Sequence, residues 1–257
     1  MSFSYTIKDI EAYLACPLKF KLKKLLKPKA ISTDEREIIT KSLADTFFKG
    51  IHMQNMSLKF SAKDAMRYMS RQWTEHRAAF METKVPSIYT EEMAATIMQS
   101  QNKINEIFNW IVKTEKAAIV EHPYKVTYKG VEIKDQIDCL FVIRGKKKTI
   151  LGSDLYIVDS GISKPSVKNL IGNLRGTLAL KHLQEEVDVY KNKVPHIYLY
   201  SPYHDTKVRL AINTHKSIDI MVENVLSNMK EDIFYPSLSK GNCKDCIFRY
   251  SCDWNQA

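Results

Sequence analysis

The sequence predicts an α+β (α/β) protein in which a helical front half precedes a sheet core. Apolar residues recur with helical spacing through about the first 120 residues. From His122-Pro123 onward, alternating or continuous β-branched runs bounded by turn residues predict strands. Five cysteines are present, three of them close to the C-terminus. Together these observations predict a helical region at 1–121, a sheet core at 122–235 and a cysteine segment at 236–257, joined in one compact unit.

The front half has recognisable helix starts. Thr6 is expected to cap a helix over 7–15, with Asp9 completing a capping box. Pro17 restarts the chain as a second, basic helical segment, LKFKLKKLLK. Further helices are expected at 36–57, at 61–83 with Ser61 as cap, and at 90–121 with Thr90 as cap.

The second half alternates strands and helices. Strands are expected at 124–130, 131–145, 149–161, 196–201 and 207–214, and helices at 166–187 and 216–233. This order indicates a sheet core covered by helices.

Composition limits the function classes. No apolar run approaches the roughly 18 to 20 residues that a bilayer span needs. The start is amphipathic and lacks a signal-peptide core, so a cytoplasmic protein without membrane contact is expected. The net charge of +10 favours polyanionic partners, although a lysine-rich soluble surface gives the same balance.

The cysteines predict a metal centre. Cys243, Cys246 and Cys252 follow a C-x2-C-x5-C spacing, and Cys16 before Pro17 is the candidate fourth ligand. Four thiolates can hold an iron–sulfur cluster or zinc. A lone cysteine so far from a trio favours the cluster, while zinc and uncoordinated thiols remain alternatives. Cys139 lies in an apolar run and is expected to be a small buried side chain.

Both ends of the chain resemble one family. YTIKDIEAYLACPLKFKL and FYPSLSKGNCKDCIFRYSC resemble the first and last segments of iron–sulfur nucleases related to AddB and to the CRISPR-associated RecB-like exonucleases. The resemblance implies a PD-(D/E)XK restriction-endonuclease-like core, a structural 4Fe-4S cluster on the four cysteines, and DNA cleavage with Mg²⁺ or Mn²⁺.

The resemblance also implies catalytic positions. Asp138 matches the first metal-binding acid, Asp159 the second, and Glu121 an upstream acid. Two carboxylates on neighbouring strands can hold Mg²⁺ or Mn²⁺, which activates water and polarises a phosphate. Asp138 and Asp159 are therefore the expected metal ligands.

The expected lysine is missing. A lysine two residues after the second acid would share its strand face, but Gly161 stands there. Lys164 and Lys134 are possible substitutes only by relocation.

Two further elements of the family pattern are also absent. The front-half histidine is replaced by Asp45 or Thr46, and His52, which comes later, is expected to be a surface or packing residue. A Gln-x-x-x-Tyr pair is replaced by Gly176 and Leu180. The combined losses indicate a catalytically degenerate core.

A nuclease-like fold without chemistry can still bind DNA. Basic and aromatic residues that could contact phosphates and bases are Lys19, Lys21, Lys23, Lys24, Arg67, Arg71 and Trp73. The expected function is binding of single-stranded or branched DNA, within a replication, recombination or transcription assembly of a bacterium or its virus. An active Mg²⁺- or Mn²⁺-dependent single-strand exonuclease and a protein–protein adaptor are the alternatives.

Overall fold

A computed structural model shows an α+β protein with a mixed sheet. It describes residues 4–26, 35–81, 99, 102–109, 117–144, 150–161, 163–192, 194–211 and 215–237, together with residues 243, 246, 248 and 252. Within these residues, no helix has both the length and the apolar character that crossing a membrane requires. The chain divides into two compact units, which interleave along the sequence.

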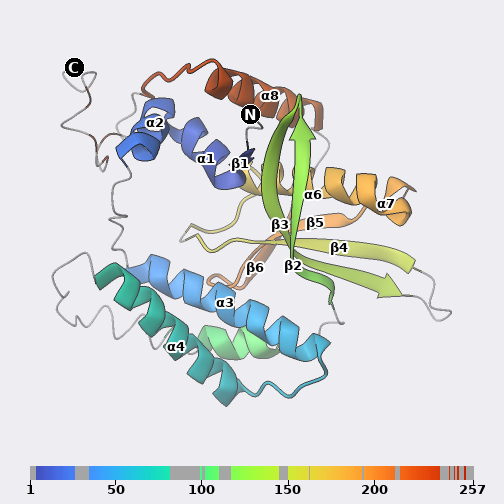
Figure 1. The fold of residues 1–257 in the computed structure, drawn as a ribbon. Helices are drawn as coiled ribbons and strands as arrows, with labels where there is room; N and C mark the ends of the chain where they lie inside the picture. The colour runs from blue at the N-terminus through green and yellow to red at the C-terminus, as the bar shows by residue number, and fades with distance from the viewer. Residues whose placement is uncertain are drawn as a thin grey trace. The chain divides into compact units, whose positions relative to one another are not determined.

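The first unit contains residues 1–29, 124–135 and 213–257. Its helices are α1 (Ile7–Ala15), α2 (Pro17–Leu26) and α8 (His215–Lys230). The short strand β1 (Ser4–Thr6) pairs in parallel with the beginning of β3. Figure 1 shows the end of the β2–β3 hairpin beside α8. The Tyr128 hydroxyl donates to Asp219 Oδ1 at 2.5 Å and so ties the hairpin to this helix.

The second unit contains residues 30–123 and 136–212. Its helices are α3 (Glu35–Asn55), α4 (Ala62–Met81), α6 (Leu170–Glu186) and α7 (Asp188–Asn192), and residues 102–109 are also helical. Its strands are the first part of β2 (Ala117–Tyr128), the larger part of β3 (Val131–Arg144), β4 (Ile150–Val158), β5 (His196–Ser201) and β6 (Thr206–Arg209).

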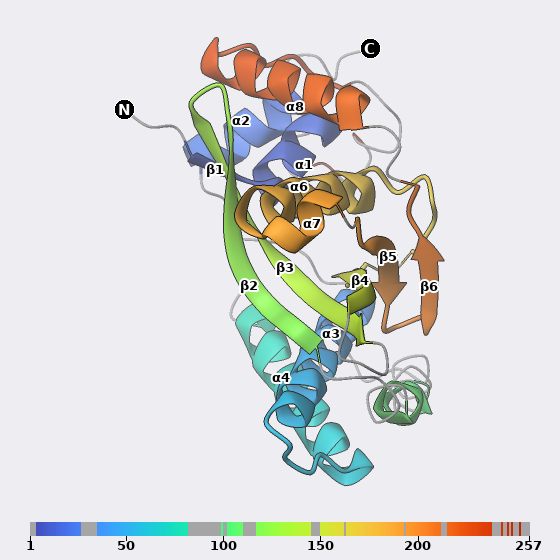
Figure 2. The same ribbon diagram turned by 90° about the vertical axis from the view of Figure 1, so that its right-hand side faces the viewer.

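The strands of this unit form one sheet. Strand β3 pairs with β2 and antiparallel with β4, β4 pairs in parallel with β5, and β5 pairs antiparallel with the edge strand β6 (Figure 2). Because β4 and β5 are parallel, the chain must cross over between them, and α6 and α7 make that crossover.

Helices cover both faces of this sheet. On one face α3 packs against α4, and their apolar side chains meet those of the strands in a buried cluster that includes Leu43, Phe47, Cys139, Tyr156 and Tyr200. The other face carries α6, where a Cβ at Gly172 would come within 3.1 Å of Leu199. Neighbouring residues along a strand therefore face different helices.

Most expected elements are confirmed. The capping box of Thr6 and Asp9 starts α1, and Ser61 and Asp64 form the same arrangement before α4. The expected strand at 196–201 coincides with β5. The fold is α+β as predicted, although the two units cut across the predicted regions because β2 and β3 run through both.

The prediction of a helix over 90–121 is wrong at its C-terminal end. Residues 117–121 belong to β2, because pairing with β3 overrides the local helical pattern. Two short elements, β1 and α7, were not expected from the sequence.

We predict that Ser61→Ala lowers the free energy of unfolding by about 1 kcal/mol. The Ser61 hydroxyl accepts from the Asp64 N–H at 3.2 Å, and this bond caps the first turn of α4. Urea unfolding followed by circular dichroism measures the change. Ser70→Ala, on an exposed position within α4, is the matched control, and equal unfolding midpoints for both variants would contradict the capping role.

Candidate functional site

Asp138 lies at the centre of the candidate catalytic region. Its side chain is almost completely buried, with 2 % exposed, on the α6 face of β3. Gln136 Nε2 donates to Oδ1 at 3.2 Å, and the Val158 N–H donates to Oδ2 at 2.7 Å. Paired residues of β3 and β4 run from Cys139–Tyr156 to Arg144–Ile150. Asp138 precedes the Cys139–Tyr156 pair, so its side chain bonds the backbone of β4 just outside the paired region.

Arg175 supplies the cation that this buried carboxylate needs. Its Nη2 donates to Asp138 Oδ1 at 2.9 Å, and its Nη1 donates to the Val158 carbonyl at 3.5 Å. The Arg175 side chain is 17 % exposed. A buried carboxylate without a compensating charge is strongly destabilising, so Arg175 makes this arrangement possible. Three groups thus donate to a carboxylate that the sequence predicted to bind metal.

Sequence reasoning missed Arg175, although its signal is present. The helix α6 reads LIGNLRGTLALKHLQEE, and Arg175 lies between the buried residues Leu174 and Gly176. A charged side chain within a buried apolar run usually has a charged partner. Asn169 caps this helix by accepting from the Gly172 N–H at 2.7 Å, which fixes the start from which Arg175 projects.

Asp159 follows the end of β4 on the same sheet face as Asp138, by the alternation of side chains. Its N–H donates to the Tyr200 carbonyl at 2.8 Å and so extends the strand pairing. Its Oδ1 accepts from the Gly161 N–H at 2.8 Å. A Cβ at Gly161 would lie 2.9 Å from that same oxygen, so a lysine there would displace the Asp159 side chain.

The other predicted participants lie apart from this pair. Glu121 adopts a left-handed backbone (φ +46°) within β2, and its Oε2 lies 2.9 Å from His52 Nε2 of α3. Since α3 covers the face opposite α6, the structure does not bring the Glu121 carboxylate to Asp138. Lys164 and Lys134 are both exposed, Lys134 on β3 and Lys164 in the segment after Asp159.

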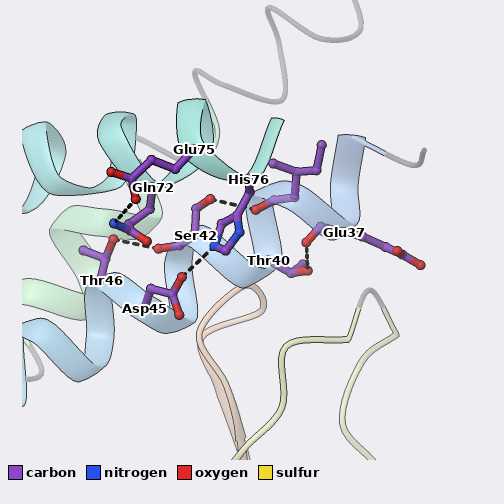
Figure 3. Close-up of polar contacts among 9 residues, drawn as sticks. Glu37, Thr40, Ser42, Asp45, Thr46, Gln72, Glu75 and His76 are labelled. Carbon is purple, nitrogen blue, oxygen red and sulfur yellow. Dashed lines mark hydrogen bonds and ion pairs between the residues drawn. The ribbon is translucent and has the colours of Figure 1, made fainter. Parts of the chain in front are cut away.

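Asp45 and Thr46, which lie where the resemblance implied a histidine, make contacts within the helical pair of α3 and α4. Asp45 Oδ2 lies 2.7 Å from His76 Nε2, linking α3 to α4 (Figure 3). The buried Thr46 hydroxyl donates to the Ser42 carbonyl at 2.7 Å within α3. Across all residues that the structure describes, no three His, Cys, Asp or Glu side chains form a group that could hold a metal ion.

In the first unit, the segment 232–237 is fastened to α1 and α2. The Tyr13 hydroxyl donates to the Ile233 carbonyl at 2.7 Å, and the Leu18 N–H donates to the Tyr235 carbonyl at 3.1 Å. The Phe234 ring stacks on Phe20, with centroids 6.1 Å apart. We call this set of contacts the terminal clasp.

The terminal clasp reaches the predicted cluster ligand Cys16. Its Sγ accepts from the Lys19 N–H at 3.5 Å and from the Ser237 N–H at 3.4 Å. Cys16 is partly buried and free of disulfide bonds, as are Cys243, Cys246 and Cys252. Cysteine sulfurs are the ligands that hold iron–sulfur clusters, and hydrogen bonds to a ligand orient it. Cys16 thus lies beside the backbone that leads to the other three cysteines.

Cys139 behaves as the sequence predicted. It is completely buried in the apolar cluster of the second unit. Burial raises the pKa of its thiol well above the usual value, and the Asp138 and Glu121 charges raise it further. Cys139 therefore remains a neutral thiol.

Two of the lysines that were predicted to contact nucleic acid have partners within the protein. Lys21 Nζ lies 2.7 Å from Asp232 and 4.9 Å from the Phe234 ring centroid, within the terminal clasp. Lys24 Nζ lies over the Phe20 ring at 4.7 Å and 3.4 Å from Asp9.

On α4, Arg71 pairs with Glu75 at 2.7 Å and Trp73 packs partly buried on the apolar cluster. Lys19 is partly buried, while Lys23 and Arg67 are exposed.

No family model matches the chain, and no curated protein matches it significantly.

We predict that Arg175→Met lowers the free energy of unfolding by about 3 to 5 kcal/mol, because it leaves the Asp138 charge buried and unpaired. Asp138→Asn should also destabilise, and the double variant should lose less than the sum of the single losses. Urea unfolding measures all three variants.

Arg71→Met is the matched control, since its pair with Glu75 is solvent-exposed and should change the free energy of unfolding little. A strictly additive Asp138/Arg175 cycle would show that the pair does not stabilise the fold.

Proposed function

We propose that this protein binds single-stranded or branched DNA through a RecB-like, PD-(D/E)XK-type fold whose catalytic centre is degenerate. The observation that carries the proposal is the Asp138–Arg175 ion pair, at 2.9 Å. A guanidinium neutralises the carboxylate to which the family resemblance assigns a metal. In this proposal Asp138 stabilises the fold and does not bind a metal ion.

The arrangement of the second acid supports the same conclusion. Asp138 on β3 and Asp159 after β4 lie on neighbouring strands, as the resemblance implies. Gly161, however, places only a backbone N–H against Asp159 where the family pattern has a lysine. Without a cation at that position, the negative charge of a phosphoryl transition state has no donor there.

We also propose a structural 4Fe-4S cluster on Cys16, Cys243, Cys246 and Cys252. The two amide N–H groups on Cys16 Sγ suit a thiolate ligand. When bound, the cluster would link the start of the chain to its end, and the terminal clasp already fastens those two segments. The clasp residues themselves orient Cys16 and fix residues 232–237, which precede the cysteine segment.

Charge supports DNA as the ligand. A net charge of +10 attracts the phosphate backbone and makes the affinity dependent on salt. A protein–protein adaptor would not require that dependence. A role within a larger replication, recombination or transcription assembly fits a DNA-binding chain that lacks its own chemistry.

We expect anaerobically purified wild-type protein to bind single-stranded DNA with a steep salt dependence and to leave it uncut in Mg²⁺ or Mn²⁺. Fluorescence anisotropy measures binding, and denaturing gels measure cleavage. Asp159→Ala should bind DNA as tightly as the wild type, because this acid holds a turn and not a metal. Metal-dependent cleavage by the wild type that disappears in both Asp138→Ala and Asp159→Ala would instead establish the exonuclease with a relocated lysine.

The cluster has its own test. We expect Cys16→Ser and Cys252→Ser to lose iron, sulfide and the visible absorption of the wild type. Cys139→Ala should keep them, since its thiol is buried in the apolar cluster of the second unit. Zinc without iron in the wild type would refute the iron–sulfur assignment and weaken the family resemblance.

A further inference from the structure

The sheet of the second unit carries aromatic and basic side chains at its β5–β6 edge. Strand register places Tyr156, Tyr198 and Arg209 in one row across β4, β5 and β6. The next row holds Val158, Tyr200 and Lys207, on the same face. These rows lie on the face that also carries the buried cluster under α3 and α4.

Side-chain burial decreases from β4 to the edge strand β6, and along β5 from Tyr200 to His196. Tyr200 is 2 % exposed and Tyr156 is 5 % exposed, whereas Tyr198 is only partly buried against the cluster. Lys207 and Arg209 on the edge strand are exposed. The preceding residue on this face of β5, His196, has a side chain that is 48 % exposed. The covered part of the sheet face thus ends at Tyr198.

The side chains at this edge are held in a defined arrangement. The Tyr156 and Tyr198 rings stack with centroids 5.3 Å apart and an interplanar angle of 25°. Lys207 Nζ donates to the Tyr156 hydroxyl at 3.2 Å and lies 5.0 Å from the Tyr198 ring centroid. His196 meets Tyr198 edge to face, with centroids 6.5 Å apart. The stack and the cation restrict the Tyr198 ring before any ligand binds.

Basic residues on an edge strand have a simpler explanation, because they prevent pairing between sheets of different molecules. That explanation does not account for the ordered aromatic stack beside them. A partly buried aromatic ring beside cations on the neighbouring strand is an arrangement that suits binding of unpaired bases and their phosphates. Two acids lie near this edge, and both have partners within the fold. Asp154 pairs with His196 in the row before Tyr156 and Tyr198, and its Oδ1 lies 3.3 Å from His196 Nδ1. Asp205 Oδ1 accepts from the Tyr200 hydroxyl at 3.2 Å.

We propose that the β5–β6 edge is a binding surface for single-stranded nucleic acid, in which Tyr198 stacks on a base and Lys207 and Arg209 contact flanking phosphates. The inference rests on the proposed DNA binding and names a surface for it other than the lysine, arginine and tryptophan positions expected from the sequence. Since every base has a flat aromatic face, the surface binds with little sequence preference.

The test compares the full-length wild type and its variants on a labelled oligothymidine and on an abasic oligomer of the same length. Tyr198→Leu keeps an apolar side chain but removes the ring, and it should weaken oligothymidine binding by roughly 5- to 150-fold. Its effect on the abasic oligomer should be small, because no base is there to stack. Tyr198→Phe keeps the ring and should bind as the wild type does.

The cations are tested through salt dependence. Lys207→Gln and Arg209→Gln should each lower the slope of log affinity against log salt by about one, on both oligomers. Lys168→Gln, exposed elsewhere in the same unit, is the control and should leave the slope unchanged.

Binding of Tyr198→Leu equal to that of the wild type, with an unchanged circular dichroism spectrum, would overturn this surface while leaving the proposed function intact. A wild-type protein that binds neither oligomer at low salt would overturn both.

Discussion

The structure of the second unit depends on one buried carboxylate. Burying the Asp138 carboxylate inside a sheet covered by helices is costly unless positive charge and hydrogen-bond donors surround it. Arg175, Gln136 and the Val158 backbone meet that requirement. The same contacts tie β3, β4 and the crossover helix α6 together. A metal ion and a guanidinium can each balance a buried carboxylate, and Arg175 places a guanidinium beside Asp138.

The first unit is organised by a different constraint. Its helices α1 and α2 come from the start of the chain and its last described segment from the end, so their association must overcome the entropy of closing a loop of nearly the whole sequence. The terminal clasp does this with aromatic packing of Tyr13, Phe20 and Phe234 and with backbone hydrogen bonds. Because Cys16 lies between α1 and α2, the clasp also sets the environment of its sulfur.

The basic residues have separate roles. Lys21 and Lys24 lie over aromatic rings and beside carboxylates, and they stabilise contacts within the first unit. Lys207 and Arg209 lie at an exposed strand edge beside a stacked tyrosine pair. A net charge of +10 does not show which cations stabilise the fold and which could attract phosphate. The positions of their partners distinguish the two roles, because a cation already close to a carboxylate contributes less to attracting phosphate.

The sequence by itself determined the element types and most of their positions. Thr6 with Asp9 and Ser61 with Asp64 are local signals, because a capping box needs only residues three positions apart. The strand HIYLYS was equally readable from its β-branched and aromatic residues. The burial of Cys139 followed from its apolar neighbours.

Only the tertiary structure decided which residues meet. Arg175 reaches Asp138 across 37 positions of chain, and Ser237 reaches Cys16 across 221. Glu121 turned toward His52 through a left-handed residue within a strand that was expected to be helix. Local propensity carries no information about these pairings, since they arise when the sheet, its crossover helix and the two chain ends pack together.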